Sequence, residues 1–351
     1  MTGVTRRSFI GAGAMAAVSL ALGGCATRSN IPSTAGPSTS GRRRSSGTSS
    51  HSSGAGAPSE LRFATGNENG TYFAVGSTIA GLARERSDLE LSVVQSGGSR
   101  DNLAEIEGDK AQFGFCQSDV MAYAYDGTYL FEGEPMVSFS TVASLYDEQV
   151  QIVTCDPSLK SVQDLKGKRV SIGEAKSGVY FNAVEILAAY GMTESDIDAE
   201  FSSFTDSADD LAEGSIDAAF IVAGAPTTAI MDVAATKAVY LIPLDDLAIA
   251  DLLDASPYYV ESTIAAGTYA GQDSDIKTVA VSAVIVASDF VDEETAYAFT
   301  ACIFDNLEEL SDRNERFSEV DVIAAGSVTS VPYHPGAAKY FKSQGVSVLV
   351  K

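Results

Sequence analysis

The sequence predicts an α/β fold with two lobes that are joined by crossing strands. From residue 61 onward, strand-like apolar segments alternate with segments of helical spacing, and this series occurs twice. A near-continuous apolar run follows at 278–287, as expected of a strand that is buried on both faces. A chain that leaves one lobe, builds the other and returns has two crossings, which we place near 150–154 and 278–284.

The individual elements follow from apolar spacing. In the first series we expect strands at 61–65, 91–95, 113–116 and 149–155, and helices at 72–82, 102–107 and 120–125. In the second series we expect strands at 169–173, 199–204, 217–222 and 238–242, and helices at 179–190, 207–213 and 226–235. Helices at 293–310, 314–320 and 335–343 end the chain. Lobe I then comprises residues 60–150 plus 278–351, and lobe II comprises residues 151–277.

Residues 1–25 have the pattern of an export signal. The pair Arg6-Arg7 precedes Phe9 and an apolar run that is too short to span a bilayer, as in a Tat signal. The sequence LGGC at 22–25 resembles a lipobox, in which the signal is cut before the cysteine and the thiol is acylated. We therefore expect an extracytoplasmic protein, lipid-anchored to the cell membrane at Cys25. A lipobox also serves Sec-exported proteins, so the export route stays open.

A polar linker and an acidic body follow this signal. Residues 26–59 consist largely of Ser, Gly, Thr, Ala and Pro, which predicts a flexible tether with a reach of about 30 Å. Of the 23 basic and 47 acidic residues, six basic and one acidic lie in residues 1–60. The remaining 17 basic and 46 acidic residues give the body a net charge of −29. Nucleic-acid binding needs a basic surface, so we exclude a nucleic acid as partner.

The sequence contains no pattern of metal ligands or catalytic groups. Cys116, Cys155 and Cys302 stand alone, and we expect at least two of them to be small buried residues. The sequence leaves open whether any two of them form a disulfide. His334 lies between two prolines and is expected to have a structural role at the start of a helix. We therefore expect no metal, no cofactor and no enzymatic activity.

Turns rich in Gly, Ser and Thr connect the predicted strands to the helices that follow. They lie at 65–72, 96–99, 117–119, 174–178 and 223–226. In open α/β sheets, ligands bind outside the carboxyl ends of the strands, where helix N-termini present free N–H groups. One such turn is weak evidence, but five in matching positions favour a site for a small carboxylate or another polar acid.

The body also resembles the TAXI family, the solute-binding subunits of one class of TRAP transporter. The matching motifs are GTY at 70–72, SGGS at 96–99 with Asn102, QSD at 117–119, DLKGKRV at 164–170, SG at 177–178, AGAP at 223–226, AGTY at 266–269 and PYHPGA at 332–337. The resemblance covers residues 60–345 and implies a type II periplasmic-binding-protein fold. It further implies a dicarboxylate ligand of the glutamate or 2-oxoglutarate class and delivery to a sodium-driven TRAP-type permease. Residues 67–69 depart from the usual Gly-rich loop, which leaves the ligand open.

These turns and motifs provide the candidate ligand-binding residues: Asn69, Thr71, Tyr72, Ser96, Gly98, Ser99, Asn102, Gln117, Ser118, Ser177, Gly178, Tyr180, Ala223, Gly224 and Ala225. No arginine lies within these turns, and Arg100 and Lys176 are the cations expected nearby. We therefore expect neutral donors and helix ends to hold the ligand.

The leading hypothesis is a monomeric solute receptor, tethered to the membrane, whose lobes close on a small organic acid or amino acid. It passes the solute to a TRAP-type permease. The alternatives are a binding protein for an ABC importer or a sensor kinase, and, with less support, an extracytoplasmic enzyme on the same fold.

Overall fold

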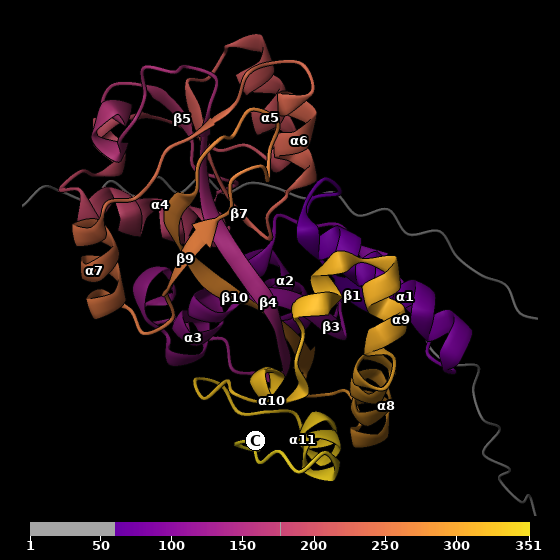
Figure 1. Ribbon diagram of the computed structural model, residues 1–351. Helices are drawn as coiled ribbons and strands as arrows, with labels where there is room; N and C mark the ends of the chain where they lie inside the picture. The colour runs from indigo at the N-terminus through magenta and orange to yellow at the C-terminus, as the bar shows by residue number, and fades with distance from the viewer. Residues whose placement is uncertain (1–59, 176) are drawn as a thin grey trace, which may run out of the picture. The chain divides into compact units, whose positions relative to one another are not determined.

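The computed structural model describes residues 60–175 and 177–351 of the chain (Figure 1). The predicted signal, the linker and the Cys25 anchor lie outside the described residues. The strands form one mixed sheet with the order β2-β1-β3-β10-β4-β7-β5-β6, while β8 pairs with β4 and β9 pairs with β10. Two groups of parallel strands, β2-β1-β3 and β7-β5-β6, thus flank an antiparallel central pair. We call the two groups with their helices the first half and the second half.

The two long central strands are common to both halves. β4 (Phe139–Thr154) pairs along most of its length with β10 (Ile276–Ser288). The early part of β4 continues the first half, and its last six residues pair with β7 in the second half. The strand predicted at 149–155 is therefore only the end of β4, because residues 139–148 are also strand. The predicted lobe boundaries near 150 and 278 fall inside these strands and stay a prediction.

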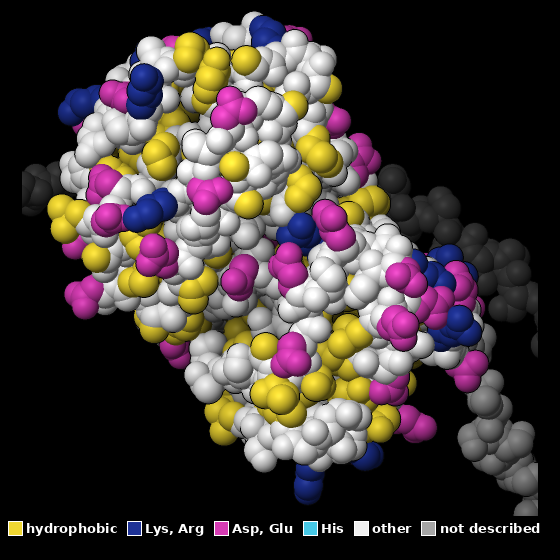
Figure 2. Space-filling view, viewed as in Figure 1, with side chains coloured by type: hydrophobic (Ala, Val, Ile, Leu, Met, Phe, Trp, Pro, Cys, Tyr) yellow, Lys and Arg dark blue, Asp and Glu magenta, His cyan; other side chains and the backbone are white. Residues whose placement is uncertain are grey.

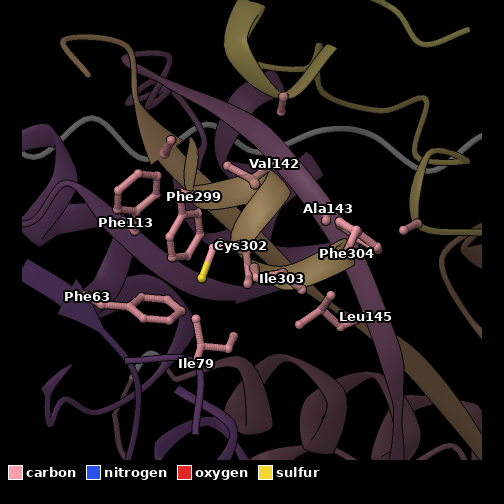
Figure 3. Close-up of a cluster of buried hydrophobic side chains, with 14 of the residues drawn as sticks. Phe63, Ile79, Phe113, Val142, Ala143, Leu145, Phe299, Cys302, Ile303 and Phe304 are labelled. Carbon is pink, nitrogen blue, oxygen red and sulfur yellow. The ribbon is translucent and has the colours of Figure 1, made fainter. Parts of the chain in front are cut away.

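The first half consists of three parallel strands with helices and the C-terminal segment. Its elements are β1 (Leu61–Ala64), α1 (Thr71–Arg86), β2 (Leu91–Val94), α2 (Ser99–Glu107), β3 (Phe113–Gln117), α3 (Ser118–Asp126), α8 (Glu293–Phe304), α9 (Leu307–Arg313), α10 (Val322–Ala325) and α11 (Pro335–Ser343). Phe299 of α8 lies between the rings of Phe63 and Phe113 in the core, with centroid distances of 5.6 and 4.1 Å (Figure 3). Thus α8, which comes late in the chain, packs into the hydrophobic core that the first strands of the chain begin.

The second half repeats the same alternation. Its elements are β5 (Arg169–Ser171), α4 (Gly178–Ala189), β6 (Asp198–Glu200), α5 (Phe204–Glu213), β7 (Ala218–Ala223), α6 (Thr228–Ala234), β8 (Tyr240–Leu241), α7 (Asp246–Ala255) and β9 (Val260–Ile264). The strand predicted to reach residue 204 ends at Glu200, because Ser203 caps α5 by accepting a hydrogen bond from the Asp206 N–H. The sequence patterns did not predict α7 and β9.

Smaller deviations occur near the C-terminus. The single helix predicted at 293–310 is divided into α8 and α9, and residues Glu315–Glu319 form a 3₁₀ helix instead of the predicted α-helix. Acidic side chains are spread over the face of the body in Figure 2, with fewer basic ones among them. Within the described part of the chain, no helix is both long and apolar enough to cross a membrane.

Candidate functional site

A pocket of about 50 Å³ lies where the two halves meet. Its walls come from the loops that follow β1, β2 and β3 in the first half and β5, β6 and β7 in the second. The lining residues are Gly66, Asn67, Gly70, Thr71, Tyr72, Gly97, Gly98, Ser99, Gln117, Glu148, Glu174, Ser177, Gly178, Val179, Ser202, Ser203, Phe204, Val222 and Ala223. The carboxyl ends of both parallel strand groups therefore face this pocket, where open α/β sheets bind ligands.

Five helices have their N-cap residue in the lining of this pocket. The N-cap residues of α1, α2, α3, α4 and α5 are Gly70, Gly98, Gln117, Ser177 and Ser203. The φ angle of Gly98 is +101°, a conformation that favours glycine. The N-terminal end of a helix carries N–H groups without a partner in the helix and the positive end of the helix dipole, which suits a carboxylate or another anionic group.

Gly178 lets the two halves approach each other. A Cβ atom at this position would lie 1.3 Å from Oε1 of Gln117, which belongs to the first half. The same Gln117 side chain donates from Nε2 to Oδ1 of Asn182 on α4, at 2.8 Å. Its Oε1 is buried and has no hydrogen-bond partner. The α4 helix is thus held directly against β3.

Further hydrogen bonds join the halves on another side of the pocket. Thr71 donates from Oγ1 to the carbonyl of Gly224, at 3.2 Å. Asn69 donates from Nδ2 to Oγ1 of Thr205 at 3.1 Å, and Thr205 donates to Oδ1 of Asn67 at 2.8 Å. The structure therefore shows the two halves in contact around the pocket.

A buried carboxyl group forms part of the pocket wall. Glu148 of β4 is 2 % exposed, and its Oε2 accepts a hydrogen bond from the Tyr72 hydroxyl at 2.7 Å. Burial raises the pKa of Glu148 well above its usual value, more than the bond from Tyr72 lowers it. The nearby Tyr146 hydroxyl is buried without a partner. The half-buried Glu174 also lines the pocket, and burial, with smaller repulsion from Asp101 and Asp206, raises its pKa.

No lysine or arginine is among the described residues that line the pocket. Arg100 lies over the ring of Phe131, with its guanidinium carbon 5.0 Å from the centroid. Lys176 lies outside the described residues. The expectation that these two would be the nearby cations missed Arg316, whose side chain would lie 3.1 Å from a Cβ on Gly224. Arg316 is not part of the pocket lining and pairs with Glu315 and Glu319.

The structure brings eight of the fifteen predicted residues to the pocket: Thr71, Tyr72, Gly98, Ser99, Gln117, Ser177, Gly178 and Ala223. Asn69 and Gly224 lie just outside it and make the contacts between the halves.

The other five predicted residues have roles in the surrounding structure. Asn102 donates to the carbonyls of Thr65 and Phe115, and Ser96 donates to Asn102. The other three bond elsewhere, with Ser118 accepting from the Ser282 N–H, Tyr180 donating to Glu194 and the Ala225 N–H donating to Gln149.

Sequence reasoning missed Glu148 and the segment 202–204. Glu148 lies in a strand that was predicted to begin one residue later, so its position in the pocket wall was not visible. Residues 202–204 were read as strand, although a serine three residues before an aspartate is a recognisable helix start. That capping signal was available and would have placed this loop beside the other candidate turns.

The histidine and cysteine residues of the described body have structural roles and do not belong to the pocket. His334 caps α11, accepting from the Gly336 N–H at Nδ1 and bonding the Val291 carbonyl at Nε2, and burial lowers its pKa. Cys116, Cys155 and Cys302 are free thiols, of which the first and third are buried. Among residues 60–175 and 177–351, no group of His, Cys, Asp and Glu side chains is placed to hold a metal ion.

A family model described as NMT1-like family matches residues 63–345. The chain belongs to the NMT1-like family. PhnD1 from Prochlorococcus marinus, a structure in complex with methylphosphonate, is similar at 10 % identity and a TM-score of 0.50, over 74 % of this chain and 90 % of that one. The alkanesulfonate-binding protein SsuA from Xanthomonas axonopodis pv. citri, bound to MOPS, is similar at 14 % identity and a TM-score of 0.46, over 83 % and 92 %.

These findings confirm the predicted fold class, an α/β fold of the two-lobed periplasmic-binding-protein type. The predicted relationship is confirmed only as periplasmic-binding-protein-like, and the resemblance to the TAXI family stays a prediction.

Proposed function

We propose that this protein is an extracytoplasmic solute receptor that encloses a small polar molecule between its two halves. The main support is the pocket itself, which both halves line at the carboxyl ends of their strands and whose lining contains the N-cap residues of five helices. The NMT1-like family match and the fold shared with PhnD1 agree with this role. The role is binding without catalysis, since His334 is a helix cap and lies outside the pocket lining.

The pocket favours an amino acid over the other small acids. A carboxylate of the ligand would lie at the N–H groups of α1, α2 and α4, as at other helix N-termini. An ammonium group would lie beside Glu148 and Glu174, the two carboxyl groups in the pocket wall, where its positive charge would favour their ionised forms against the burial that raises their pKa values. Within the class expected from the TAXI resemblance, this favours glutamate-like solutes over 2-oxoglutarate, which has no ammonium group.

A phosphonate or sulfonate is the second candidate ligand, because PhnD1 is described in complex with methylphosphonate. A strongly acidic ligand without an amine would meet two carboxyl groups and, among the described lining residues, no cation. Arg316 is the nearest alternative, and it would have to leave Glu315 and Glu319 to reach such a ligand. The amino acid is therefore the better supported ligand.

For the membrane partner we favour an ABC-type importer, the first alternative above. The support for a TRAP-type permease is the motif resemblance at the turns, whereas the family and fold matches name no TRAP protein. We keep lipid anchoring at Cys25, export through the twin-arginine signal and a monomeric state as parts of the proposal. Replacing Cys25 by Ala is expected to move the protein from the membrane fraction to the soluble fraction.

Thermal unfolding in the presence of candidate ligands tests the proposed function. A true ligand at 100 times its Kd stabilises the folded state by about 2.7 kcal/mol. Amino acids, 2-oxo acids, dicarboxylates and alkylphosphonates are compared, with the expectation that an amino acid gives the largest shift. Glu148→Gln, which keeps the shape but cannot carry a negative charge, should weaken amino-acid binding. Asp126→Asn on the surface should not. If no compound in these four classes shifts the transition, the receptor proposal fails.

A further inference from the structure

A chain of polar side chains connects α3 of the first half to α4 of the second. Asn182 on α4 donates from Nδ2 to Oδ2 of Asp119 at 2.8 Å and to the Tyr259 hydroxyl at 2.7 Å. The Tyr259 hydroxyl donates to one carboxylate oxygen of Glu185, and the Tyr123 hydroxyl donates to the other at 3.0 Å. Two carboxyl groups from opposite halves thus belong to one hydrogen-bonded cluster.

Most of this cluster is removed from water, although Glu185 itself is only partly buried. Asp119 and Asn182 are 0 % exposed, and Tyr123 and Tyr259 are 5 % and 4 % exposed. Oδ1 of Asp119 is buried and has no hydrogen-bond partner. Among the described residues, no lysine or arginine forms a hydrogen bond or ion pair with any member of the cluster. An ionised pair of carboxylates is therefore poorly stabilised here.

Two effects make the charge of Asp119 unfavourable, its burial and the repulsion from Glu185 on α4, whereas the hydrogen bond from Asn182 and nearby backbone N–H groups favour that charge. The other titratable groups near Asp119 have pKa values that its charge helps to raise: Cys116, Tyr123, Glu148, Tyr258 and Tyr259. Burial, followed by repulsion from Glu185, raises the pKa of Asp119 to about 7. Burial also raises the pKa of Glu185, against the hydrogen bonds from the two tyrosines. Each shift favours the protonated form in the closed arrangement.

We propose that the Asp119–Glu185 cluster is a proton-dependent latch, which takes up a proton when the two halves close and so favours the closed form in acid. The contacts of the cluster join α3 to α4 and to the α7–β9 segment, so separation of the halves breaks them. Both carboxyl groups then face water and return to ordinary pKa values near 4. This inference requires that the halves separate, as proposed above, and it does not depend on which ligand is bound.

The sign of the effect follows from proton linkage. Because the closed form has the higher pKa, it holds more protons than the open form between about pH 4 and pH 7. Each unit of rising pH in this interval lowers the closing constant by at most about tenfold for one proton. Above about pH 7, both forms are ionised at Asp119 and the effect levels off.

Small-angle X-ray scattering of the ligand-free protein between pH 5 and pH 8 tests this latch. The radius of gyration should rise with pH as the closing constant falls, by about twentyfold between pH 5.5 and 7.5. Asp119→Asn mimics the protonated acid and should stay compact across the range. Asp126→Asn, an exposed carboxylate at the end of the same helix, should behave like the wild type.

Two results overturn the latch: a wild-type radius that does not change with pH, or an Asp119→Asn variant with the wild-type pH dependence. If Asp119→Asn fails to fold by circular dichroism, Glu185→Gln replaces it, because a glutamine amide can accept a hydrogen bond from one tyrosine hydroxyl and donate one to the other. These measurements contain no ligand, so they separate the latch from the proposed function. If the radius depends on pH but no solute binds in the thermal screen, only the receptor proposal is overturned and the latch stands.

Discussion

At the scale of single residues, Gly178 is the position where an added side chain would meet the closest contact. Adding a methyl group there forces the buried Gln117 side chain to move and breaks its hydrogen bond to Asn182. We expect Gly178→Ala to weaken ligand binding by about tenfold or more, since one lost buried hydrogen bond costs about 1–3 kcal/mol. Isothermal titration measures this change.

The matched control for that substitution is Gly81→Ala in α1. A Cβ atom at Gly81 meets no other atom within 4 Å, and alanine favours the helix over glycine by about 0.5–1 kcal/mol. Gly81→Ala should therefore keep full affinity and raise the unfolding temperature. Equal affinities for the two variants would contradict the close contact between β3 and α4.

Glu148 gives a second prediction at this scale, on stability. Its carboxyl group has a raised pKa in the folded protein, so its contribution to stability is lost as pH rises above the unfolded value near 4.3. The loss is at most about 1.4 kcal/mol per pH unit. Glu148→Gln should therefore be more stable than the wild type in urea at pH 8, with the difference disappearing near pH 4. If the wild type is more stable than Glu148→Gln at pH 8, the prediction is wrong.

Single residues also show the limit of sequence reasoning for the site. The glycine and serine turns were predictable, because helix starts after strand ends have a recognisable local pattern. The place of the Glu148 carboxyl group in the pocket wall was not predictable, since an acidic residue is normally on the surface. Its burial depends on Tyr72, which is 76 positions away in the chain.

At the scale of elements, the packing of α8 onto the first half makes a measurable contribution to stability. Phe299 is fully buried between Phe63 and Phe113 (Figure 3). Phe299→Ala should lower the free energy of unfolding by about 3–5 kcal/mol, as for other buried phenylalanines. Phe290→Ala, at a side chain that is 77 % exposed, should change it by no more than about 0.5 kcal/mol. Denaturant titration compares the two.

Most elements could be predicted because each has its own periodic pattern, but several were misplaced or missed, among them the early part of β4 and α7. The early part of β4 is buried on both faces, so it lacks the alternation that identifies a strand. In α7, Leu247 and Leu253 face solvent, which obscures the apolar stripe of that helix. In each case the burial is decided by neighbours that are distant in sequence.

At the scale of the whole molecule, the acidic surface acts on the approach of ligands. The chain has 47 acidic and 23 basic residues, a net charge of −24, and Figure 2 shows acidic side chains across one face. Raising the salt from 0.1 to 1 M shortens the Debye length from about 10 to about 3 Å. The association rate of a dicarboxylate should therefore rise with salt, and that of a zwitterionic amino acid should change little. Stopped-flow measurements decide this, and a dicarboxylate rate that falls with salt would contradict it.

The position of β10 has a consequence for synthesis on the ribosome. This strand lies between β3 and β4, although more than 120 residues separate it from either in the chain. The first half therefore lacks the strand that joins β3 to β4 until residues 276–288 have emerged, whereas β5, β6 and β7 are complete by residue 223. Protease protection of stalled nascent chains should appear in the second half first, so the part of the body that is translated earlier becomes resistant later.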